Sequence, residues 1–300
     1  MNLTNHSHIN LKTVACFLAV GIGLTSARAE SLLLDFGPTT VASPYLTLDP
    51  GHDAGTVSGS DTAWNVITTS AANSSLNFGD GSSASGITLT MGQEATAGNN
   101  TISYSTAITK TTLAGTGGGT AGQKNLLSAG SIYGDDTSST AVGRDGFFGD
   151  GTGTTGNAVG LRLDGLVAGD YLIYIMARNV NSDVASSPMN IYSSVGASAG
   201  TFDFSALTGS GEANTAYASA TYTDQYTTFQ AGENYVGLNV TINSGDSLFL
   251  AVDGASASET RGFLNTLEIT TAPVPEPGTW AVFGMGMLAL LLTFKKRQAI

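Results

Sequence analysis

The chain has 300 residues, with 23 acidic and 11 basic side chains and a net charge of −12 at neutral pH. Nucleic-acid binding needs a basic face that displaces counterions from phosphates, so this charge argues against a nucleic-acid partner. The single cysteine, Cys16, lies near the amino terminus. Disulfides and thiol catalysis are therefore excluded for the rest of the chain.

The first 29 residues have the three regions of a secretory signal peptide. A polar start and Lys12 precede an apolar stretch, and Ala27 and Ala29 form a small-x-small cleavage site before Glu30. We therefore expect signal peptidase to remove residues 1–29 during export.

Residues 30–272 form the body of the chain, and they predict an all-β ectodomain. Short β-branched or aromatic runs recur between Gly, Asp, Asn and Ser, and no long stretch has a helical period. This pattern is typical of a β-sandwich or a jelly roll. The predicted strands are Ser31–Phe36, Trp64–Thr69, Gly86–Met91, Ala158–Leu163, Tyr171–Arg178, Tyr235–Ile242, Ser247–Val252 and Phe263–Thr270.

One segment shows the strand period clearly. Val159, Leu161 and Leu163 point to one face of their predicted strand and Arg162 to the other. Gly165 then permits a turn into the next strand, because glycine adopts conformations closed to other residues.

The opening run Leu32-Leu-Leu-Asp-Phe-Gly, this strand–turn–strand unit and the closing run 261–270 resemble the galactose-binding-like jelly roll of many exported bacterial proteins. The resemblance implies that the first and last strands lie close together, in a fold that often binds carbohydrate. No ligand-binding signature of that fold is present here. We expect one body with the Gly-rich segment 114–122 as a surface loop; the alternative is a linker between two β domains.

A candidate calcium site lies in the acidic segment that holds Asp135, Asp136, Asp145 and Asp150. Asp side chains beside glycine turns supply the oxygen ligands and sharp bends that calcium requires. The spacing does not match an EF-hand loop, and the alternative is a polar loop whose two phenylalanines reach the core. No other cofactor is expected.

Aromatic side chains with polar neighbours are the candidate ligand-binding residues, since carbohydrate sites stack sugar rings on aromatic rings. Trp64 is the only tryptophan of the body, and Tyr217, Tyr222 and Tyr226 lie among Thr, Ser, Asp and Gln. Tyr45, Tyr133 and Tyr192 are further candidates. The alternative for Trp64 is a core position at the start of its strand.

No catalytic residue is predicted. His52 is the only histidine after the signal peptide, and neither a Gly-x-Ser-x-Gly elbow nor a His-Glu-x-x-His motif occurs. A carboxylate pair could hydrolyse a glycoside, but the sequence singles out no pair among 23 acids. A non-enzymatic protein is therefore the prediction, and a secreted glycan-active enzyme is an alternative.

The carboxyl-terminal segment combines a hinge, a span and a basic stop. Val274-Pro275-Glu276-Pro277 within 273–279 cannot continue a helix, and 280–294 carries no charge. A helix of that length covers about 22 Å, so it can enter the ~30 Å hydrocarbon core with some thinning of the bilayer or snorkelling of lysine. Lys295, Lys296 and Arg297 in the tail 295–300 should stay cytoplasmic.

This order of hinge, transmembrane helix and basic tail resembles the PEP-CTERM sorting signal of exported bacterial proteins. The resemblance implies an exosortase as partner, a transient membrane anchor and a final place at the cell surface or in the extracellular matrix. Together with the body it predicts an exported, non-enzymatic surface protein that binds extracellular polysaccharide. A structural surface protein without a specific ligand is the alternative.

Overall fold

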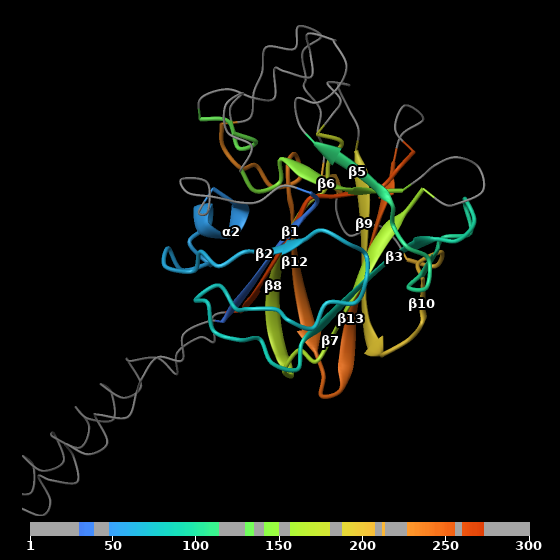
Figure 1. Ribbon diagram of the computed structural model, residues 1–300, viewed down its shortest axis with the longest axis horizontal. Coiled ribbons are helices and arrows are strands. Elements are labelled where there is room, and N and C mark those ends of the chain that lie inside the picture. The colour runs from blue at the N-terminus through green and yellow to red at the C-terminus, as the bar shows by residue number, and fades with distance from the viewer. Residues whose placement is uncertain are drawn as a thin grey trace, which may run out of the picture.

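The structure is a computed structural model, and within the residues it describes the fold is almost entirely β, as predicted (Figure 1). The short helix α2 (Pro50–Asp53) begins at proline, and its N-cap Asp49 accepts a hydrogen bond from the backbone N–H of His52 at 2.9 Å. The described residues are 30–38, 48–113, 130–134, 141–149, 157–180, 188–207, 212–213, 227–255 and 260–272.

The first layer is a five-stranded sheet. Its strands pair antiparallel, except that β1 and β2 are parallel. In spatial order they are β12 (Val236–Ile242), β8 (Gly169–Met176), β15 (Thr266–Thr271), β1 (Ser31–Phe36) and β2 (Asn65–Ile67).

The second layer is a seven-stranded antiparallel sheet, and a small three-stranded sheet accompanies the two layers. The seven strands are, in order, β10 (Thr201–Asp203), β4 (Thr101–Ser103), β3 (Thr88–Glu94), β7 (Val159–Asp164), β13 (Asp246–Gly254), β9 (Met189–Ala197) and β11 (Glu212–Ala213). The small sheet is β14 (Phe263–Leu264), β6 (Asp145–Phe148) and β5 (Lys110–Leu113).

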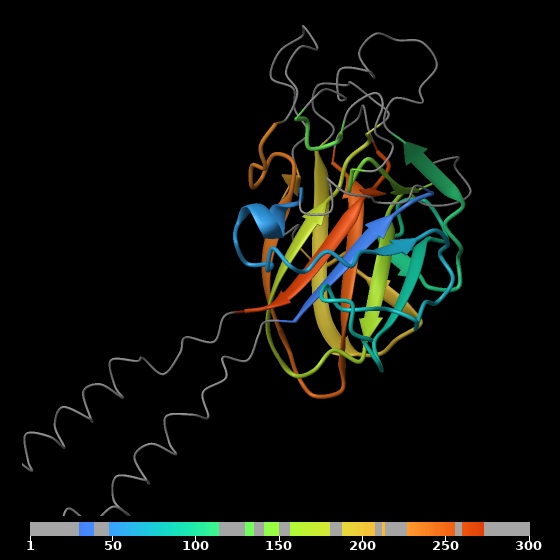
Figure 2. The ribbon, with the colours of Figure 1, turned by 60° about the vertical axis from the view of Figure 1, so that its left-hand side comes forward.

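The main core lies between the two large sheets. Successive side chains of a strand point to opposite faces, so one set from each strand faces the other layer. Leu32 and Leu34 of β1 join Leu248 and Leu250 of β13 in this cluster, all at most 2 % exposed. The layers face one another in Figure 2, which makes the body a β-sandwich.

Each sheet also buries part of its outer face. On the five-stranded sheet, the side chains that point away from the main core include Glu268 of β15, which lies beneath α2. On the seven-stranded sheet, Phe249 of β13 packs with Phe202 and Phe204 in a second cluster. The two outer faces therefore differ, because the first is polar and the second aromatic.

All eight predicted strand runs contain observed strands, with shifts at their ends. β1 has the predicted bounds and pairs with β15 in the register Ser31↔Thr270, so the first and last strands do lie together. The predicted strand Phe263–Thr270 is divided at Asn265, which separates β14 from β15. The Asn265 side chain explains the break, since it accepts from the Arg178 backbone N–H at 2.6 Å and donates to the Asp145 carbonyl at 2.6 Å.

The turn after β7 carries the chain from one sheet to the other, because β7 and β8 belong to different layers. Gly165 in this turn has φ +85°, and a Cβ atom there would lie 2.0 Å from the carbonyl oxygen of Gly86. Glycine is required here, because it adopts this positive φ without strain and has no Cβ atom to collide with that oxygen.

Several predicted segments lie outside the described residues: the signal peptide 1–29 before Glu30, the Gly-rich stretch 114–122, and the segment 273–300 with its hinge, span and basic tail. In the residues that are described, no helix is both long and apolar enough to span a bilayer.

Candidate functional site

The outer face of the seven-stranded sheet carries an aromatic patch, which we define as Tyr192, Phe204, Phe202 and Phe249. Tyr192 lies on β9 directly across from Ala251 of β13. Its ring is half-buried and packs against Phe204, with centroids 4.8 Å apart at 33°. Phe202 and Phe249 extend the patch at a centroid distance of 5.6 Å. Because Phe204 is buried, it holds the Tyr192 ring in a fixed orientation.

Polar side chains flank this patch on the same face. Asn190 lies two residues before Tyr192 and hydrogen-bonds to it, and the register places Asp253 directly across from Asn190. Burial, and secondarily the nearby charge of Glu94, raise the pKa of Asp253 to about 6. An amide group and a carboxyl group therefore flank the Tyr192 ring of the patch.

Glu94 is the second acid near the patch, but both of its oxygens are already engaged. Oε1 accepts from the backbone N–H of Asn100 at 2.8 Å, and Oε2 from those of Asn157 and Ala158 at 2.8 and 3.2 Å. Its side chain is almost fully buried. Glu94 thus fixes the two loops that meet at this end of β3.

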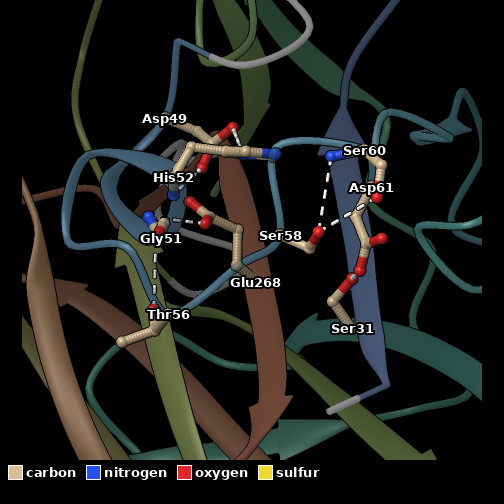
Figure 3. A network of polar contacts seen from close by, with 9 residues as sticks. All are labelled: Ser31, Asp49, Gly51, His52, Thr56, Ser58, Ser60, Asp61 and Glu268. Carbon is tan, nitrogen blue, oxygen red and sulfur yellow. Dashed lines mark hydrogen bonds and ion pairs between the residues drawn. The ribbon is translucent and has the colours of Figure 1, made fainter. Parts of the chain in front are cut away.

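The outer face of the five-stranded sheet holds a different group of polar residues around α2 (Figure 3). His52 Nδ1 lies 2.5 Å from Asp49 Oδ2, and its side chain is 5 % exposed. Glu268 Oε2 accepts from the backbone N–H of Gly51 at 2.8 Å. A Cβ atom on Gly51 would lie 2.2 Å from that same oxygen, so glycine allows α2 to seat on β15.

Glu268 is buried beside Asp49. Complete burial, then the neighbouring charge and hydrogen bond of Asp49, raise the pKa of Glu268 well above its usual 4.5. Asp49 in turn contacts the His52 ring. The hydrogen bond between Gly51 and Glu268 joins the helix to the sheet.

The arrangement around His52 does not form a nucleophilic catalytic site among the described residues. Asp49 orients the ring as an acid orients a catalytic base. However, Nε2 is buried, and it has no hydrogen-bond partner among the described residues. That His52 is not catalytic stays a prediction, and this geometry supports it.

A second acid pair lies on the same outer face, at the end of β1. Burial, and secondarily the charge of Asp145, raise the pKa of Asp35 well above its usual 3.8. Asp35 Oδ1 accepts from the backbone N–H of Gly143 at 3.3 Å. Asp145 was predicted as a calcium ligand, and here it is fully buried on β6.

The other predicted site residues are placed as follows. Trp64 is half-buried just before β2 and belongs to none of the apolar clusters of the described body. Asp135, Asp136 and Asp150 of the calcium prediction lie outside the described residues, as do Tyr217, Tyr222 and Tyr226. No group of three or more His, Cys, Asp or Glu side chains with metal-binding geometry occurs in the described ranges. Calcium binding therefore stays a prediction.

The sequence offered Tyr192 only as one of several candidate aromatic residues, because strand β9 was not predicted. A signal was present: Met189, Ile191 and Val195 alternate with polar residues and pack into the core. That period of two places Asn190 and Tyr192 together on the opposite face.

The comparisons with known proteins place the carboxyl-terminal segment. Residues 273–297 match the model of the PEP-CTERM protein-sorting motif. No curated protein and no solved structure matches the chain, so the likeness to galactose-binding-like jelly rolls stays a prediction.

The protein is therefore a β-sandwich followed by a sorting motif. In particular, it carries the signal of exosortase substrates, and it is an exported protein directed to the cell surface. The predicted hinge Val274-Pro275-Glu276-Pro277 falls within the matched residues.

Proposed function

We propose that this exported protein binds extracellular polysaccharide through the aromatic patch, without catalysing a reaction. The observation that carries the proposal is Tyr192, a half-exposed ring held by Phe204 and flanked by Asn190 and Asp253. Such a ring offers a flat apolar face to the C–H side of a sugar, while amide and carboxyl groups bind its hydroxyls.

The geometry of the acids favours binding over hydrolysis. A glycosidase needs two carboxyl groups that both reach the scissile bond, one as acid and the other as base or nucleophile. The pKa of Asp253 is raised to about 6, which would suit the general acid of such a pair. Its neighbour Glu94 instead uses both oxygens to accept from backbone N–H groups, so Glu94 is not free to act as the second carboxylate.

The proposal includes a path to the surface. Signal peptidase removes residues 1–29, and the apolar run 280–294 holds the precursor in the inner membrane with Lys295, Lys296 and Arg297 on the cytoplasmic side. An exosortase then processes the chain at the matched motif 273–297. The body works outside the cell, at the surface or in the extracellular matrix.

A glycan array followed by calorimetry on the best-bound glycan tests the proposal. Tyr192→Ala removes the platform and should weaken binding at least tenfold, about 1.4 kcal/mol. Tyr192→Phe keeps the ring and should retain most of the affinity. The protein should release no reducing ends from the bound glycan.

Two controls make the result decisive. Trp64→Ala tests the aromatic residue that the sequence favours, and it should leave affinity unchanged if the patch is the site. Loss of binding in Trp64→Ala but not in Tyr192→Ala would move the site to the first sheet. A chain that binds no glycan would support the structural role without a ligand, and cleavage of the glycan would support the enzyme.

A further inference from the structure

A second candidate site lies at the end of the sandwich where the body joins the sorting motif. A pocket of about 500 Å³ opens there between the layers. Its interior is apolar and is lined by side chains of the main core. The apolar lining includes Leu32, Phe78, Ile87, Leu166, Tyr171 and Ile269. A volume of this size is in the range of small-molecule pockets, about 300–1,000 Å³.

The rim of the pocket is exposed and differs from its interior. Val167 is 76 % exposed, which is the largest exposure of any bulky apolar side chain in the described body. Its carbonyl accepts from the Tyr171 hydroxyl at 2.7 Å, so Val167 is held at the mouth. Glu30 and Asp170 also line the pocket, and no basic side chain does so among the described residues.

The position of the pocket in the chain determines what it faces. Glu30 and Leu32 come from the start of β1, while Thr271 and Ala272 come from the end of β15. Figure 2 shows the start of β1 and the end of β15 side by side. The sorting motif begins at residue 273, directly after the last lining residue.

The distance to the membrane follows from the chain length. Seven residues, 273–279, separate the pocket from the apolar run 280–294. Fully extended, they reach at most about 25 Å. While 280–294 is anchored as proposed above, the pocket mouth and Val167 must therefore stay close to the bilayer surface.

We infer that this pocket takes an acyl chain of a membrane lipid and seats the precursor body on the outer leaflet of the inner membrane. The apolar interior suits the hydrocarbon chain, and Val167 enters the interface beside it. The acidic rim disfavours anionic headgroups and attracts a primary ammonium. The lipid class is therefore a zwitterionic lipid with an ethanolamine headgroup. The inference rests on the proposed anchoring of the precursor and not on glycan binding.

Photo-crosslinking of the full chain tests the inference. The chain is reconstituted in phosphatidylethanolamine–phosphatidylcholine vesicles that contain a lipid with a diazirine on its acyl chain, and labelled peptides are identified by mass spectrometry. Label is expected in the peptide 166–171 as well as in 280–294. Label in 280–294 reports the anchor by itself, so a failed anchor and an empty pocket are distinguishable.

Two variants separate occupation of the pocket from mere nearness to the bilayer. Gly169→Leu fills the pocket, since a Cβ there meets only Tyr171 Cε2, at 4.0 Å. It should lower label in 166–171 about tenfold and leave label in 280–294 unchanged. Val167→Asp changes only an exposed side chain and should lower the same label. Leu207→Asp, at an exposed apolar residue outside the pocket, is the matched control and should have no effect.

Three results would overturn the inference. The first is label confined to 280–294. The second is label in 166–171 that survives both Gly169→Leu and Val167→Asp. The third is a protein–protein crosslink from a photoactivatable amino acid placed at Val167, without lipid label in 166–171, which would assign the pocket to the chain's own hinge or to a second copy.

Discussion

Glu268 is a buried acid whose ionisation affects the stability of the fold. It is fully buried under α2 and accepts a hydrogen bond from Gly51, while Asp49 lies on its other side. Its pKa is raised well above 4.5 by burial and by Asp49. The folded protein therefore binds this proton more tightly than the unfolded chain, and its contribution to stability depends on pH.

The sign of this dependence follows from the raised pKa. The contribution of Glu268 is complete below its unfolded pKa of 4.5 and is lost as the pH rises through the folded value. Glu268→Gln keeps a neutral acceptor for Gly51 and a donor for Asp49. We expect the variant to lose less unfolding free energy than the wild type as the pH rises from about 5 to about 8.

Chemical denaturation at several pH values measures this difference. Glu233→Gln, at an exposed position, should follow the wild-type pH profile and serves as the control. An unchanged profile in Glu268→Gln would show that the carboxyl group is not protonated in the folded state. A buried but ionised Glu268 would also require a different account of how α2 is held.

At the scale of elements, strands with a strong period were predictable from the sequence. Val159, Leu161 and Leu163 alternate with Gly160 and Arg162, so β7 was predicted to within one residue of each observed end. β9 was missed because small and polar residues such as Ser193 and Ser194 weaken its alternation. The pairing between β9 and β13, and not the intrinsic preference of the segment, makes it a strand.

The candidate sites were less predictable, because they depend on contacts between distant residues. Tyr192 and Phe204 are 12 positions apart along the chain, and they meet because Phe204 follows β10, a strand of the same sheet, and packs on its outer face. Glu268 and Gly51 are separated by 217 positions. No local pattern identifies such pairs, since burial and register arise from the whole fold.

The turn that joins the two layers provides a test at this scale. Gly165 has φ +85°, and a Cβ there would collide with the Gly86 carbonyl oxygen. Gly165→Ala should destabilise the protein by the left-handed conformation, about 1–2 kcal/mol, and by the clash, about 1–3 kcal/mol more. Unfolding in denaturant measures the sum.

Gly245 is a matched control, because it has φ +83° and no atom within 4 Å of its hypothetical Cβ. It lies in the turn between β12 and β13. Gly245→Ala should show only the conformational cost, about 1–2 kcal/mol. Equal losses in the two variants would mean that the chain near Gly86 moves aside without cost.

At the scale of the whole molecule, the pairing of β1 with β15 brings both ends of the body to the same place. The sorting motif is therefore attached at one end of the sandwich, next to the apolar pocket. The aromatic patch lies on the outer face of the other sheet. Export and sorting can thus act on one end of the protein while the patch stays accessible to a ligand.

The sorting motif itself gives the last prediction. Pro275 and Pro277 keep the residues before the apolar run out of helix, because proline lacks a backbone N–H and disfavours helix in the preceding residue. A processing enzyme binds an extended segment more readily than a helix, since extended backbone leaves its hydrogen-bonding groups free. Replacing Pro275-Glu276-Pro277 by alanines should let the helix of 280–294 extend toward the body and block processing.

The mass of the protein recovered from a host with its exosortase decides the outcome. We expect the triple variant to keep its full carboxyl-terminal segment and to remain with the membrane fraction. Pro273→Ala lies outside the triplet but inside the matched segment, and it should be processed like the wild type. A triple variant with the wild-type mature mass would show that the enzyme recognises the apolar run and its basic end alone. In that case the extended hinge has no part in sorting.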